Sequence, residues 1–186
     1  MSQLGTLKHA YLSYFSQPAT DRVIYRLIDK HPVRSILELG VGDAVRAERM
    51  ISLASRQQAD VELRYIGIDL FEDRPAGAPQ IALKQAYLQL RQQNVKVRLV
   101  PGDPLEALTR IANEITGIDL VVVAGDQEPA SMARAWMFLP RMVHGETIFL
   151  AQAVDPQGRL GDFAPLTRQQ VDELACQGGR RRRLAA

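Results

Sequence analysis

The chain alternates apolar runs of strand length with longer segments of helical periodicity, and this alternation constrains its fold more than any other feature. Runs rich in Val, Ile and Leu are expected to form strands at Val33–Leu39, Glu62–Asp69, Val95–Val100, Ile118–Ala124 and Thr147–Gln152. Helices are expected at Asp21–Lys30, Ala44–Gln58, Ile81–Asn94, Pro104–Thr116, Pro129–Met142 and Thr167–Gln177. Each connection between strands is long enough for the crossover that parallel neighbours require. The pattern therefore predicts a parallel sheet covered by helices on both faces.

We interpret the 186 residues as one α/β domain with a Rossmann-like, doubly wound, mostly parallel sheet in a three-layer α/β/α arrangement. Residues 1–30 are expected to form a helical segment that packs on the core or covers it, residues 31–179 the α/β core itself, and residues 180–186 a basic C-terminal tail. Phe71–Pro79, the densest cluster of Pro and Gly, is expected to be an ordinary surface loop.

The segment after Leu150 is short, so we expect five or six strands without the full C-terminal β-hairpin. The pair Gly178 and Gly179 is expected to stop the last helix. Beyond Arg180 we expect a short edge strand or a frayed tail.

Cysteine content and charge exclude several classes of protein. A lone Cys176 cannot form an internal disulfide, and no Cys/His cluster has the spacing of a zinc site. The N-terminal residues do not resemble a signal peptide and no apolar run is long enough to span a membrane, so we expect a cytoplasmic protein without membrane contact. The net charge of +2 comes from the Arg180–Arg183 run, without which acidic residues outnumber basic ones. Nucleic acid is therefore not an expected partner.

The most informative segment is Ile36–Ala44, where a buried strand runs into Gly40 and Gly42 and then directly into a helix. Glycine lets the backbone turn sharply and lets a ligand approach it, while the helix N-terminus offers unpaired N–H groups. A dinucleotide fingerprint would need Gly or Ala where Val45 stands, and no Lys-Ser or Lys-Thr follows to make a phosphate-binding P-loop. Neither of these motifs accounts for Glu38, an acid two residues before the first glycine.

This turn resembles motif I of the class I S-adenosylmethionine-dependent methyltransferases, with Ala44 in place of the third glycine. The resemblance implies that Glu38, Gly40 and Gly42 bind S-adenosylmethionine. The alternative is a glycine turn in a nucleotide-type fold that binds nothing. Val45 argues against a third hypothesis, a nicotinamide-dependent oxidoreductase.

The ends of the later strands extend the resemblance over most of the chain, from about Val33 to Gln152, which implies that the core of residues 31–179 is methyltransferase-like. It implies that the cofactor is also contacted by residues at the ends of the second, third and fourth strands: Asp69, Leu70, Gly102, Asp103 and Ala124. Asp69 would accept hydrogen bonds from both ribose hydroxyls, and Asp103 would lie near the adenine amine. Two structural alternatives stay open: Asp69 could cap the turn that follows it, and Asp103 could be the N-cap of a helix that begins at Pro104.

The fourth and fifth strands are similar to those of the small-molecule O-methyltransferases, which implies a small-molecule hydroxyl as methyl acceptor. Asp126 is the candidate catalytic residue, and an exposed turn acid with no chemical role is the alternative. Ala124, Gln127 and Gln152 stand where that subgroup often has metal ligands or a base, so we expect no catalytic metal. These departures motivate a rival hypothesis, a non-catalytic binding or scaffold protein.

Because the segment after Leu150 is short, we expect substrate recognition to come from the N-terminal segment or from a partner chain, such as the second copy in a homodimer. His9 lies on this N-terminal segment with Tyr11, Tyr14 and Phe15. An aromatic stripe of this spacing is more typical of a packing face than of a substrate site. His144, in contrast, is expected on the surface at the edge of the sheet opposite the cofactor.

Overall fold

A computed structural model describes residues 11–12, 14–57 and 60–184, and the side chains of these residues up to Arg180. Its centre is a six-stranded sheet in the order β3-β2-β1-β4-β5-β6. The strands are β1 (Ser35–Leu39), β2 (Leu63–Asp69), β3 (Val95–Pro101), β4 (Ile118–Val123), β5 (Val143–Val154) and β6 (Leu160–Leu166). The first five are parallel and β6 is antiparallel to β5. The predicted fold class is confirmed.

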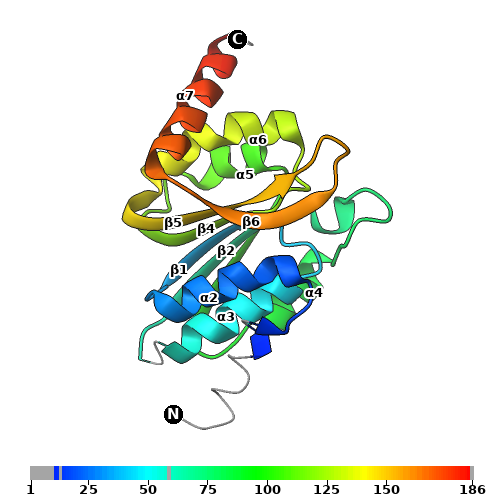
Figure 1. Ribbon diagram of the computed structural model, residues 1–186, viewed down its shortest axis with the longest axis vertical. Helices are drawn as coiled ribbons and strands as arrows, with labels where there is room; N and C mark the ends of the chain where they lie inside the picture. The colour runs from blue at the N-terminus through cyan, green and yellow to red at the C-terminus, as the bar shows by residue number, and fades with distance from the viewer. Residues whose placement is uncertain (1–10, 13, 58–59, 185–186) are drawn as a thin grey trace.

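Helices cover both faces of the sheet in three layers (Figure 1). One face carries the 3-10 turn η1 (Ala19–Asp21), α2 (Arg22–Lys30), α3 (Val45–Gln57) and α4 (Leu83–Leu90). The other carries α5 (Pro104–Ile111), α6 (Pro129–Ala135), the 3-10 helix η3 (Trp136–Arg141) and α7 (Arg168–Leu184). A core cluster lies on each side of the sheet, because strands buried on both faces are apolar along their whole length. None of the helices in the described part of the chain combines the length and apolarity that a membrane crossing needs.

The carboxyl ends of the central strands lie level with one another. Leu39 of β1 pairs with Ile68 of β2 on one side and with Val123 of β4 on the other. β2 and β3 lie on one side of β1, whereas β4, β5 and β6 lie on the other, so the strand order reverses between β1 and β4. In open α/β sheets, ligands bind at the carboxyl ends of the strands where the order reverses.

The C-terminal part of the chain differs from the expectations in two ways. β5 and β6 form an antiparallel pair around the turn at Asp155–Gly158, so the sheet ends in a hairpin, although its six strands agree with the expected five or six. The last helix does not stop at Gly178 and Gly179, as expected, but continues to Leu184 and projects beyond the helical layer (Figure 1). Gly178 serves close packing instead: a Cβ there would lie 2.8 Å from the carbonyl oxygen of Ala133 in α6. The expectation of an edge strand or frayed tail beyond Arg180 is therefore wrong up to Leu184.

The loop Phe71–Pro79 after β2 is largely exposed, as expected from its composition, but two of its residues are buried. It begins with the 3-10 turn η2 (Phe71–Asp73), where Phe71 is completely buried and has φ +53°. Arg74, the next residue, is 9% exposed. Phe71 and Arg74 therefore pack inward, toward the carboxyl end of β2.

Candidate functional site

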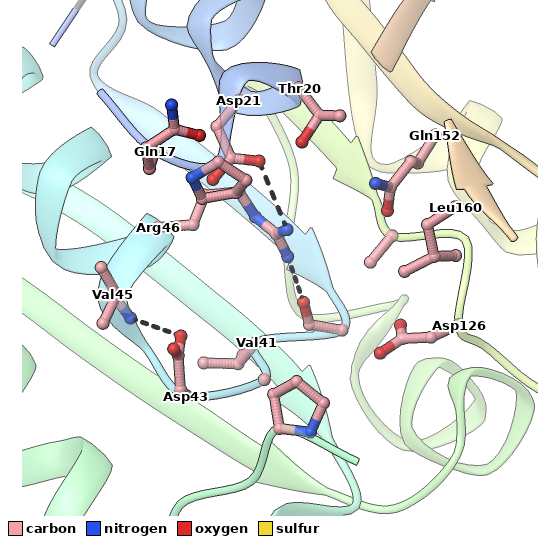
Figure 2. A pocket seen from close by; sticks show the side chains of 15 residues that line it. Gln17, Thr20, Asp21, Val41, Asp43, Val45, Arg46, Asp126, Gln152 and Leu160 are labelled. Atoms are coloured by element: carbon pink, nitrogen blue, oxygen red, sulfur yellow. Dashed lines mark hydrogen bonds and ion pairs between the residues drawn. The ribbon is translucent and has the colours of Figure 1, made fainter. Parts of the chain in front are cut away.

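A cleft of about 420 Å³ opens at the carboxyl ends of β1 and β4 (Figure 2). Its floor is the turn between β1 and α3, and its walls come from the segment before α2, the end of β4 and the β5–β6 hairpin. The lining residues are Gln17, Pro18, Thr20, Asp21, Gly40, Val41, Gly42, Asp43, Val45, Arg46, Pro79, Ala124, Asp126, Gln152 and Leu160. Its size lies within the range of small-ligand pockets.

The two predicted glycines have different roles in the turn. Gly40 has φ +95°, and a Cβ on it would lie 2.4 Å from Gln127 Nε2 and 2.7 Å from Ala124 Cβ. Gly42 has φ +65° and nothing within 4 Å of its Cβ position, so its backbone faces open space. Ala44 also has a positive φ, +64°, although it carries a side chain. Gly40 is thus required for packing between the strand ends, whereas Gly42 leaves a backbone surface open to a ligand.

Glu38 lies below the turn and is completely buried. Its Oε1 accepts a hydrogen bond from Arg46 Nε at 2.6 Å, and its Oε2 accepts one from the Tyr65 hydroxyl. Burial raises the pKa of Glu38, and the positive charge of Arg46 opposes that rise. The resemblance places Glu38 at the cofactor, and in the structure Arg46 lies between its carboxylate and the cleft.

Arg46 lines the cleft and contacts several of its neighbours. Its guanidinium also donates to the carbonyl oxygen of Gly40 at 2.5 Å and lies 3.9 Å from Asp21 Oδ1 (Figure 2). On another side it lies 5.3 Å from the centroid of the Phe163 ring of β6. This arginine links the first turn of α3 to the glycine turn, the N-terminal segment and the hairpin.

Asp69, at the end of β2, is 1% exposed, and both of its carboxylate oxygens accept hydrogen bonds from other residues of the protein. Its Oδ2 accepts from Gly42 N at 2.9 Å and its Oδ1 from Phe71 N at 2.8 Å. The guanidinium of Arg74 donates to both oxygens, with Nε–Oδ1 and Nη2–Oδ2 distances of 2.5 Å. The capping role left open by the sequence is therefore present, and the two oxygens that would meet a ribose diol are both engaged by Arg74.

The same guanidinium also contacts Asp126 through its third nitrogen, Nη1, and so joins Asp69 to Asp126. Arg74 Nη1 lies 2.5 Å from Asp126 Oδ2, and Gln127 Nε2 donates to Asp126 Oδ1 at 2.8 Å. Burial alone would raise the pKa of Asp126, but the hydrogen bond and charge of Arg74 outweigh it and hold that pKa below its usual value. In this arrangement Asp126 is a weak base.

The adenine-side candidates lie at the ends of β2 and β3. Asp103 is the N-cap of α5, since Oδ1 accepts from Leu105 N at 2.9 Å and Glu106 N at 3.0 Å, and also from the Ser131 hydroxyl. Partial burial raises the pKa of Asp103, but these hydrogen bonds more than offset the rise and hold it low. Leu70 is 37% exposed, and Gly102 has φ +128°. The N-cap role of Asp103 is thus present, and all three of these hydrogen bonds use one of its two oxygens.

The polar groups at the ends of β4 and β5 are partly committed to structure. Gln152 accepts from Gly125 N at 3.1 Å and donates to the carbonyl oxygen of Gly161 at 3.0 Å, so it fastens the hairpin to the end of β4. Ala124 is 4% exposed and contributes only apolar surface. Within residues 11–12, 14–57 and 60–184, no three His, Cys, Asp or Glu side chains gather in a way that could hold a metal ion.

Two other groups of candidates lie away from the cleft or outside the described residues. His144 lies at the opposite end of the sheet, where its Nε2 is 2.9 Å from Asp119 Oδ1. Tyr11, Tyr14 and Phe15 are 56%, 61% and 67% exposed, so the expected aromatic packing face is wrong for these three. His9 lies outside the described residues.

Sequence reasoning missed the two arginines that organise the site. Arg46 lies one helical turn after the glycines. The usable signal was Glu38, an acid in a strand predicted to be buried, because a buried carboxylate needs a partner. Arg74 lies in a loop rich in Pro and Gly, and no periodicity in that loop indicates that it folds back onto Asp69.

Comparisons with known proteins bear on the fold. No family model matches the sequence, and a search of curated proteins finds no match either. Among solved structures, the O-methyltransferase TomG from Streptomyces achromogenes, in complex with SAM, superposes with a TM-score of 0.55 at 13% identity over 97% of this chain and 78% of that one. An O-methyltransferase from Bacillus cereus, in complex with SAH, gives 0.54 at 16% identity over 97% and 77%. A TehB-like SAM-dependent methyltransferase from Corynebacterium glutamicum gives 0.52 at 13% identity over 94% and 80%.

These likenesses define the class of fold to which the chain belongs. It has the Rossmann-like α/β fold of the S-adenosylmethionine-dependent methyltransferases, O-methyltransferases among them. The cleft lies where that fold class, like other open α/β sheets, places its ligand.

Proposed function

We propose that this protein binds S-adenosylmethionine in the cleft at the ends of β1 and β4 and transfers its methyl group to a hydroxyl of a small molecule. The observation that carries the proposal is the glycine turn: Gly42 presents an open backbone to a cleft of about 420 Å³, and Asp69 lies 2.9 Å from its amide. The presence of SAM or SAH in two of the structures with the same fold supports the choice of cofactor.

The residues present fit this cofactor in their chemistry. The backbone around Gly42 would accommodate its polar chain, Asp69 the ribose, and Leu70, Gly102 and Asp103 the adenine side, while Glu38 supports the turn through Arg46. Ala124 and Asp126 would flank the methyl-bearing end, since both line the cleft beside Gly40. When bound, the cofactor supplies an activated methyl group, so the protein's contribution is to position the acceptor.

The acceptor hydroxyl must lose a proton, and we assign that proton to Asp126. Its carboxylate is the acidic group at the end of β4 that faces the cleft. We propose a metal-independent reaction, since one carboxylate is a poor site for Mg²⁺ or Ca²⁺. We also propose a cytoplasmic location, which the single free cysteine, exposed Cys176, supports.

Calorimetric titration with S-adenosylhomocysteine tests the cofactor, with NADH as a matched control because both ligands carry an adenosine. We expect heat and thermal stabilisation with S-adenosylhomocysteine and neither with NADH. Transfer of labelled methyl from S-adenosylmethionine to a panel of small hydroxyl compounds tests the reaction. Asp126→Asn should lower turnover by about 100-fold, the scale of a lost general base.

The rival hypothesis, a non-catalytic binding or scaffold protein, is favoured by one observation: Arg74 engages both oxygens of Asp69. Binding of S-adenosylhomocysteine without turnover on any acceptor would support this rival. The absence of binding at millimolar ligand would contradict the cofactor proposal itself.

A further inference from the structure

Arg74 uses all three nitrogens of its guanidinium group in contacts with two carboxylates. Its guanidinium uses Nε and Nη2 on Asp69 and Nη1 on Asp126, each at 2.5 Å. The Arg74 side chain is 5% exposed and that of Asp69 is fully buried, so the pair is shielded from solvent. Bidentate arginine–carboxylate pairs are among the strongest side-chain interactions, and burial limits their screening by salt.

The loop is built to return this arginine to the end of its own strand. Asp69 Oδ1 accepts from Phe71 N, which fixes the first residue of η2. The buried Phe71 ring and its φ of +53° set the direction of the turn, and Arg74 N donates to the carbonyl oxygen of Phe71 at 3.2 Å. A non-glycine residue at positive φ is held only where surrounding contacts over-determine it.

We propose that Arg74 is a displaceable latch, which occupies the ribose-binding carboxylate in the free protein and must leave Asp69 for the cofactor to bind. This inference rests on the proposed function. A vicinal diol needs the two acceptor oxygens of Asp69, and the same two oxygens are the ones that Arg74 engages. The two occupants therefore exclude each other, and the affinity of the free protein for the cofactor is lowered by the fraction of molecules that hold the latch closed.

The latch also couples the cofactor subsite to the acceptor subsite. Asp126 is held by the same guanidinium, through Nη1. When Arg74 moves away from Asp69, its contact with Asp126 must change as well, because one planar guanidinium group makes all three contacts. Binding of the cofactor would therefore alter the contacts of Asp126, the carboxylate to which the acceptor proton is assigned.

The test measures the affinity of S-adenosylhomocysteine by calorimetry for the wild type, Arg74→Met and Arg74→Lys. Arg74→Met keeps the length and apolar packing of the side chain without its charge, and Arg74→Lys keeps the charge without the two-pronged geometry. Arg98→Ala is the matched control. It also removes one arginine charge, but from Arg98 of β3, which forms an exposed ion pair with Glu114. We expect Arg74→Met to bind at least about tenfold more tightly than the wild type, Arg74→Lys to be intermediate and Arg98→Ala to match the wild type.

A pair of simpler ligands shows whether the competition is for the diol. Adenosine has both ribose hydroxyls and 2′,3′-dideoxyadenosine has neither. Arg74→Met should tighten the binding of adenosine and leave that of dideoxyadenosine unchanged, because only the diol competes for Asp69. A merely wider cleft would tighten both, which would overturn the latch.

Failure of this inference can be told apart from failure of the proposed function. If the wild type binds S-adenosylhomocysteine and Arg74→Met binds it no more tightly, the latch is wrong and the cofactor proposal stands. If neither binds, both are wrong. If Arg74→Met does not fold, Arg74→Lys decides, since unchanged or weaker binding by that variant also overturns the latch.

Discussion

At the residue scale, the site depends on two glycines, one that allows close packing and one that leaves the backbone open to a ligand. Gly40 and Gly42 both adopt positive φ in one turn, yet only the first is enclosed by neighbouring atoms. Ala44 shows that a side chain is tolerated at positive φ in this turn when the space allows it. The glycines of the motif are therefore not equivalent, and substitution should separate their contributions.

Gly40→Ala should lower the free energy of unfolding by about 2–4 kcal/mol, because its methyl would enter the space of Ala124 Cβ and Gln127 Nε2 in a strained backbone. Gly42→Ala should cost only about 1 kcal/mol, since its φ is unfavourable but nothing lies within 4 Å. Urea unfolding of both variants checks the difference. Equal losses would contradict the distinction between an enclosed and an open glycine.

At the scale of elements, two adjacent glycines of helix α7 have different surroundings. α7 runs from Arg168 to Leu184 through Gly178 and Gly179, where a stop is the usual outcome. Gly178 lets α7 approach the α6 backbone closely, while Gly179 faces open space. Contact with α6 therefore overrides the weak helix propensity of this pair.

Gly178→Ala should destabilise the protein by about 1–3 kcal/mol, because its Cβ would lie 2.8 Å from the carbonyl oxygen of Ala133. Gly179→Ala should stabilise it by about 0.5–1 kcal/mol through helix propensity alone. Thermal unfolding followed by circular dichroism measures both. Stabilisation by Gly178→Ala would show that α7 does not pack against α6 as closely as described.

At the scale of the whole molecule, buried and half-buried carboxylates connect distant parts of the chain. Asp119 holds the amino ends of the sheet together: it accepts from Arg34 N and the Ser35 hydroxyl, each at 2.8 Å, and pairs with His144. Partial burial raises the pKa of Asp119, but these contacts outweigh it and hold that pKa below the usual value. Asp103 and Asp126 share this direction, whereas burial raises the pKa of Glu38.

Stability should therefore fall as the pH drops below about 4, the ordinary aspartate pKa. A carboxyl whose pKa is lower in the folded state stabilises the protein fully above its unfolded pKa and loses that contribution as pH falls through its folded pKa. Asp119→Asn should cost about 1–2 kcal/mol at pH 7, from weaker hydrogen bonds, and reduce the loss between pH 6 and pH 3. Urea midpoints at these pH values measure it. An unchanged pH dependence in Asp119→Asn would contradict a contribution from this carboxyl.

The parallel core could be predicted from sequence because buried strands have a strong local signature, and Ser35–Leu39 and Ile118–Val123 lie within their expected ranges. The position of β6 was not predicted, since Gly161 and Pro165 weaken the strand pattern there and pairing with β5 stabilises it. The positions of Gly40, Gly42 and Asp69 followed from the order of motifs along the chain. The contacts of Arg74 could not, because they arise from a loop whose direction is set by tertiary packing around Phe71.

The strands at the two edges of the sheet also bear on how copies of this chain can meet. The β3 edge presents exposed Lys96 and Arg98, and the β6 strand carries Pro165, which has no N–H to donate. Charged side chains and proline at sheet edges discourage another strand from pairing there. Growth of the sheet from one molecule into the next is thereby disfavoured at both ends.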